Sequence, residues 1–193
     1  MKNFLLSILC LISLNAYSYN LSYVDTIKAK VYNDVWGQYF NKDIKIYAGS
    51  NGNVSTVRFI YEMNLGEYEA DYVFDGTTAG KSREYMDLYN NLAKAQEWSK
   101  IAKENSAETN KTIGDCSTYT TNCTISFKST NSGKSTSAMI KIEEKADFTF
   151  NEGTFMIPSG ELNKLVGYLT PWQMSMYLGT SAEKNNQADD LFN

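Results

Sequence analysis

The 193-residue chain contains no histidine and only three cysteines. Without histidine there is no Ser-His-Asp or Cys-His catalytic system, and the commonest metal ligand and general base is absent. A basic surplus is also missing, since 18 Lys and Arg stand against 22 Asp and Glu and give a net charge of −4. Nucleic-acid binding depends on basic side chains that contact phosphates. We therefore expect no nucleic-acid partner.

Long apolar runs are scarce, and the run at the N-terminus is short. Residues 4–14 are apolar apart from two serines, follow Lys2, and precede the small residues Ala16 and Ser18. This pattern is typical of a cleaved secretory signal peptide. The run is shorter than the about 20 residues that cross a bilayer, so a membrane anchor is the weaker alternative. We expect cleavage of residues 1–18, export to the periplasm or the extracellular space, and no membrane insertion afterwards.

The exported chain has the size of one domain. Residues 19–178 are expected to form a single globular domain, and the polar residues 179–193 a flexible tail. Removing Lys2 lowers the basic count to 17 against 22 acidic side chains, a net charge of −5.

Two cysteines remain after cleavage, Cys116 and Cys123, with six residues between them. In an exported protein this spacing predicts one disulfide that closes a short loop. A redox or metal role is the alternative, but the chain has neither a CxxC pair nor a histidine. We expect no metal and no cofactor.

Hydrophobic periodicity predicts an α+β fold with a mostly antiparallel sheet, packed by one long helix and one short C-terminal helix. Residues 26–31 alternate as in a strand, although the wider stretch also has apolar residues at near-helical spacing. Residues 105–122 are polar and are expected to be irregular. The remaining expected elements are strands at 43–48, 54–61, 67–74, 123–129, 136–144 and 146–157, the long helix at about 81–105, and the short helix at about 159–169 with Ser159 as its cap.

The stretch from Gly76 to Ser82 resembles a phosphate-binding loop between a strand and a helix. That motif needs a glycine five residues before Gly80, but the residue there is Asp75. A second Gly-Lys-Ser-Thr, at 133–136, lies between two expected strands and predicts only a hairpin turn. We expect no nucleotide site, and a turn followed by Thr77 or Thr78 as a cap.

Acidic residues alternate with aromatic ones along the strand at 67–74. Glu67, Glu69 and Asp71 share one face, which is suited to a basic protein surface or simply to solvent. Paired carboxylates could also hydrolyse a glycan. We assign no catalytic residue, since nothing else in the chain supports that chemistry. A calcium site is disfavoured because no recognised calcium loop is present.

Aromatic and methionine side chains supply the remaining candidate binding residues. Tyr and Trp are favoured at interfaces because they join a large apolar area to a polar tip, and Met adapts to many partners. The candidates are Trp36, beside an expected turn, and four residues of 171–178, which could instead pack onto the sheet: Trp172, Met174, Met176 and Tyr177.

These features together favour an exported, non-catalytic bacterial protein that binds another protein, as an inhibitor or an immunity-type factor does. The acidic strand face would then meet a basic partner surface. The alternatives are an envelope glycan hydrolase with paired carboxylates and a structural or surface-assembly component.

Overall fold

The computed structural model describes residues 20–63, 66–145 and 152–179. The expected signal peptide lies outside these residues, as does all of the expected tail except Gly179. The first part of the strand expected at 146–157 is likewise outside them.

The described chain forms eight strands, three α-helices and one 3-10 turn at Ala79–Lys81. The strands are β1 (Asn20–Asn33), β2 (Gln38–Asn51), β3 (Val54–Met63), β4 (Gly66–Asp75), β5 (Thr109–Asp115), β6 (Thr121–Thr130), β7 (Ser135–Glu144) and β8 (Glu152–Pro158). The helices are α1 (Arg83–Glu104), α2 (Ser159–Tyr168) and α3 (Pro171–Leu178).

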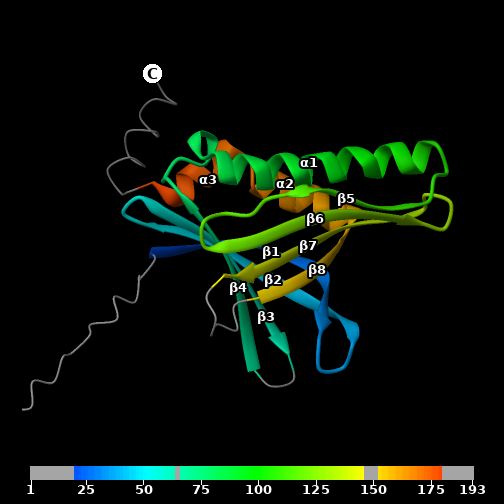
Figure 1. The fold of residues 1–193 in the computed structure, drawn as a ribbon, viewed down its shortest axis with the longest axis horizontal. Coiled ribbons are helices and arrows are strands. Elements are labelled where there is room, and N and C mark those ends of the chain that lie inside the picture. Colours follow the sequence, from blue (N-terminus) through cyan, green and yellow to red (C-terminus); the bar gives the residue numbers. More distant parts are fainter. Residues whose placement is uncertain (1–19, 64–65, 146–151, 180–193) are drawn as a thin grey trace, which may run out of the picture.

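All eight strands belong to one antiparallel sheet, in the order β4-β3-β2-β1-β8-β7-β6-β5. The α+β class is therefore confirmed. The helices lie together on one side of the sheet, with α1 running along β5–β7, while the β1–β2 and β3–β4 hairpins point away from the helices (Figure 1). The two four-stranded halves join where β1 meets β8, through the pairs Lys30 with Met156 and Val31 with Phe155.

The sheet curls until its two halves face each other. The rings of Phe59 and Tyr61 on β3 lie 5.5 and 5.4 Å from the ring of Phe155 on β8. The outer edge of β4 reaches the start of β6, where Thr121 Oγ1 accepts from Val73 N and donates to the carbonyl of Asp71. The core therefore lies inside the curl, beneath the helices.

The expectation of irregular structure at 105–122 holds for residues 105–108 and 116–120 but was wrong for the rest. Residues Thr109–Asp115 form β5, which pairs with β6 through a register shift between Thr112 and Gly114. Since β5 is the last strand of the sheet and most of its side chains are polar and exposed, it lacks the alternating apolar pattern that marks a strand. The apolar residues at near-helical spacing around 21–35 do not mark a helix, because residues 20–33 form the long strand β1.

Two expected helix caps are also corrected. The N-cap of α2 is Pro158, and Ser159 is the first residue of the helix. The Ser159 hydroxyl accepts from Lys103 Nζ instead of capping the helix. Neither Thr77 nor Thr78 caps α1, because the cap is Ser82, whose Oγ accepts from Tyr85 N.

No helix in the described part of the chain is long and apolar enough to cross a membrane.

Candidate functional site

The glycine loop after β4 is bound by the protein's own groups. Gly76, at φ +95°, donates its N–H to the carbonyl of Asn53 at 2.6 Å. Asp75 N donates to one carboxylate oxygen of Glu84, and Tyr119 N donates to the other, at 3.1 and 3.2 Å. The Glu84 carboxylate therefore lies at the start of this loop, and Gly76 N is already bound by the Asn53 carbonyl, so neither group is arranged for a phosphate.

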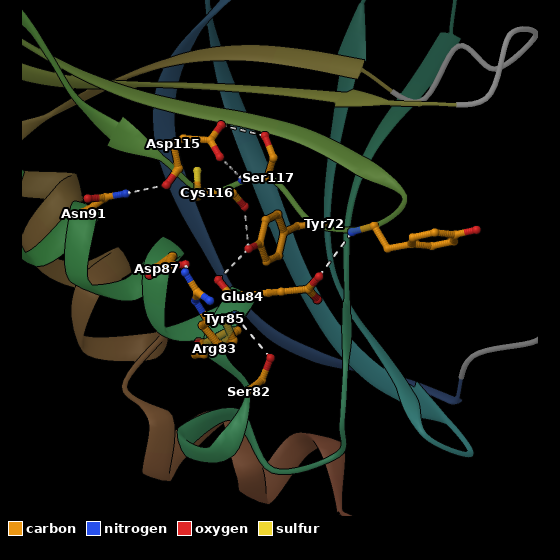
Figure 2. A network of polar contacts seen from close by, with 11 residues as sticks. Tyr72, Ser82, Arg83, Glu84, Tyr85, Asp87, Asn91, Asp115, Cys116 and Ser117 are labelled. Carbon is orange, nitrogen blue, oxygen red and sulfur yellow. Dashed lines mark hydrogen bonds and ion pairs between the residues drawn. The ribbon is translucent and has the colours of Figure 1, made fainter.

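The same network holds the disulfide loop (Figure 2). The predicted Cys116–Cys123 disulfide is present and lies beside the Tyr72 hydroxyl, which is 2.8 Å from the carbonyl oxygens of both Glu84 and Cys116. Burial raises the pKa of Tyr72 well above its usual range. Asp115 accepts from the Ser117 hydroxyl at 2.7 Å. These contacts join β4, α1 and the disulfide loop, and the disulfide is consistent with an exported protein.

The acidic residues of β4 are paired within the sheet. Arg58 on β3 forms a two-pronged contact with Asp71, at 2.7 and 2.6 Å, and its third nitrogen lies 2.9 Å from Glu69. Glu67 lies 3.9 Å from Lys45 Nζ. Asp71 is only 7% exposed, so it belongs to the buried structure rather than to an accessible acidic face.

The pKa of Glu69 is shifted upward. Partial burial raises it, the guanidinium of Arg58 opposes the shift, and the nearby carboxylates of Asp71 and Glu67 add to it. The Arg58 contact explains why the acidic face cannot be judged from β4 alone, since the compensating charge comes from the neighbouring strand.

The candidate binding residues on α3 differ in how deeply they are buried. Met174 is fully buried and packs in the core, which corrects its proposed place at a surface. Met176 and Tyr177 are half-buried, while Trp172 is 60% exposed. The helix starts at Pro171, and the Thr170 hydroxyl caps it by accepting from Gln173 N.

The tip of the β1–β2 hairpin presents two apolar side chains to solvent. Val35 is 83% exposed and Trp36 is 64% exposed. The turn is fixed locally, because Asn33 Oδ1 accepts from Trp36 N at 2.9 Å and Gly37 adopts a φ of +61° that side chains rarely allow. Trp36 is therefore held at the tip in a defined backbone conformation.

A hollow of about 400 Å³ lies beside this tip, where the β1–β2, β3–β4 and β7–β8 hairpins meet. We call it the tyrosine hollow. Its lining comprises the following residues: Tyr32, Asn33, Asp34, Val35, Tyr61, Met63, Tyr68, Lys141, Ile142, Glu143, Glu152, Gly153 and Thr154.

Two of its tyrosine rings are stacked. Tyr61 and Tyr68 lie 5.9 Å apart at an interplanar angle of 16°, and the Tyr61 hydroxyl donates to the carbonyl of Glu152 at 2.8 Å. Burial first, and then the charge of Glu152, raise the pKa of Tyr61 to about 12, so the phenol stays neutral at physiological pH. This donated hydrogen bond ties β3 to β8 at the floor of the hollow.

The charged residues of the hollow are mostly acidic. Lys141 contacts Glu143 at 2.5 Å, and this contact raises the pKa of the lysine, with further contributions from Glu152 and Asp34. Three carboxylates therefore surround one ammonium group.

The sequence analysis identified Trp36 but missed the hollow. Its residues come from three hairpins that are far apart in the chain, so no local pattern joins them. The only available signal was the aromatic spacing of Tyr61 and Tyr68 on either side of a short turn, which is equally typical of a buried strand pair.

A second hollow, of about 670 Å³, lies over β1–β3 and is lined by both lysines and carboxylates, among them Lys45 and Glu67. Glu69 and Asp71 do not line it. Within residues 20–63, 66–145 and 152–179, no group of three Cys, Asp or Glu side chains is arranged to hold a metal ion.

Comparison of the chain with models of known protein families, with characterised proteins and with solved structures finds no significant match.

Proposed function

We propose that this is an exported, non-catalytic protein that binds another protein, as an inhibitor or immunity-type factor does, through the tip of the β1–β2 hairpin and the adjoining tyrosine hollow. The observation that supports this most is the exposure of Val35 and Trp36 on a projecting hairpin (Figure 1). Tryptophan is strongly enriched among the residues that dominate binding energy at interfaces.

The fixed backbone of the tip adds to this support. Binding is weakened by any entropy lost when a loop is ordered, and a turn already held by Asn33 and Gly37 loses little. The hollow beside the tip offers a concave surface for a side chain of the partner. A protruding aromatic residue beside a pocket is a common arrangement for protein recognition.

One observation favours the glycan-hydrolase alternative, namely the raised pKa of Glu69, because an acid catalyst needs such a shift. The contact with Arg58 argues against it, since a guanidinium 2.9 Å away stabilises the ionised carboxylate. Glu69 also lines neither of the two hollows described above. We therefore place the binding function first.

Replacing Trp36 with alanine is expected to weaken binding of the partner at least about 30-fold, the effect of losing about 2 kcal/mol at a dominant interface residue. The partner is first isolated on the immobilised wild-type protein from an envelope and secreted fraction of the native organism. Its dissociation constant for each purified variant is then measured by calorimetry.

Trp172→Ala is the matched control, because Trp172 has nearly the same exposure as Trp36 but lies on α3. It should change the dissociation constant less than about twofold. Equal binding by the wild type and the Trp36 variant, or a loss confined to the Trp172 variant, would contradict the proposed site.

A further inference from the structure

We propose that the tyrosine hollow receives a basic side chain, arginine or lysine, of the protein partner. This inference rests on the proposed function, and it specifies the chemistry that the partner must present beside Trp36.

The aromatic lining suits a cation. The faces of aromatic rings carry negative potential and attract ammonium and guanidinium groups that lie over them. Tyr68 is half-buried and stacked on the buried Tyr61, and Tyr32 is 36% exposed, so these two tyrosines can present ring surface to the hollow. The fold already uses this interaction elsewhere, since Lys94 Nζ lies 5.3 Å from the ring of Trp98 on α1.

The charges around the rings complement a cation as well. Asp34, Glu143 and Glu152 line the hollow together with a single lysine, and that lysine is paired with Glu143. Two further carboxylates, on the β1–β2 turn and at the start of β8, remain in the lining. An anionic group would meet a net negative surface here, whereas a guanidinium would meet acceptors and ring faces.

The size and the apolar residues of the hollow fit one long side chain. A volume of about 400 Å³ is at the lower end of the range for ligand sites, which suits a side chain better than a large ligand. Val35 and Met63 offer apolar contacts for a methylene stem. Arg and Lys bury such stems while their charged ends reach polar groups.

The probe for the test is N-acetyl-arginine amide, with N-acetyl-citrulline amide as a neutral comparator of almost the same shape. Each is titrated into the ¹⁵N-labelled mature protein, and binding is followed by the shifts of backbone amides in the hollow. The arginine derivative should bind saturably, and the citrulline derivative about five- to tenfold more weakly, the loss expected when a cation–π contact is removed.

The double variant Asp34→Asn/Glu152→Gln should weaken arginine binding by a similar factor while keeping the Lys141–Glu143 contact. The control variant Glu97→Gln/Glu104→Gln also removes two negative charges, but from the exposed face of α1. It should change the affinity for the arginine derivative less than about twofold. Circular dichroism checks that both variants are folded.

Equal binding of the two probes, shifts that avoid the hollow, or an unchanged affinity in the Asp34/Glu152 variant would overturn the inference. So would binding of a neutral chitin trisaccharide in place of arginine, or a dimer that covers the hollow. If the partner still depends on Trp36 in any of these cases, the proposed function stands and only the basic side chain is wrong. If arginine binds but the affinity of the partner does not depend on Trp36, the hollow still accepts a basic side chain and the proposed binding through the hairpin tip is wrong.

Discussion

Replacing Arg58 with methionine is expected to lower the free energy of unfolding by about 3–5 kcal/mol, the range for removing one member of a buried ion pair. The guanidinium holds Asp71 through two hydrogen bonds and also contacts Glu69. Asp71 is 7% exposed, so its carboxylate would be left buried without that cation. Denaturation by urea, followed by circular dichroism, measures the loss.

Two further variants give this prediction its controls. Glu69→Gln should cost less than about 1 kcal/mol, because the Glu69 side chain is 38% exposed and its ion pair is screened by water. Arg58→Met combined with Asp71→Leu should recover most of the stability, since no buried charge is left. An Arg58 variant as stable as the wild type would show that the pair contributes little to the fold.

Replacing both Cys116 and Cys123 with serine is expected to lower the free energy of unfolding by roughly 2–3 kcal/mol. In the chain-entropy model, the bond restricts the unfolded chain even when the closed loop is short. The bond also supports the segment that contacts Glu84 and Tyr72, through Tyr119 N and the Cys116 carbonyl. Urea denaturation of the wild-type and double-serine proteins gives the difference.

Reduction of the wild-type protein should produce about the same loss as the double-serine variant. The mass of the oxidised protein should be two hydrogens below that of the free-thiol form. A loss below about 1 kcal/mol would mean that the hydrogen bonds of the loop hold it without the covalent bond. Free thiols in protein purified from an oxidising compartment would contradict the disulfide itself.

Much of the sheet could be predicted because many of its strands carry their own alternating pattern. Ile44 and Ile46 on β2 and Tyr72 and Phe74 on β4 all point into the core, as their spacing of two residues indicates. The turn at Gly52–Asn53 and the Thr170–Pro171 start of α3 also have local signals in the sequence. In each case the residues that determine the structure are neighbours in the sequence.

The remaining features depend on contacts between distant residues. The alternating acidic residues of β4 are visible in the sequence. Their charge is partly neutralised by Arg58, which lies on the neighbouring strand β3 directly opposite Asp71. The strand β5 has no apolar alternation, because most of its side chains are polar and exposed, and it is recognised only by its pairing with β6. The tyrosine hollow requires three hairpins to meet, and only the curl of the whole sheet brings them together.

We therefore propose that a basic partner contacts the end of the curled sheet rather than the acidic face of β4. Glu69 and Asp71 share Arg58 with each other, which leaves little net charge on that part of the face. Among the expected aromatic and methionine binding residues, Trp36 is exposed and its neighbour Val35 lines the tyrosine hollow. Trp172 is exposed too, but no residue of α3 lines either hollow described above.

Site-specific photo-crosslinking tests the proposed binding site most directly. A benzoylphenylalanine is placed at Trp36 in one protein and at Trp172 in another, and each is exposed to light with the envelope and secreted fraction. We expect the label at position 36 to crosslink one defined protein, and the label at 172 to give no such product. A crosslink from position 172 alone, or none from either position while the partner is still captured, would contradict binding through the hairpin tip.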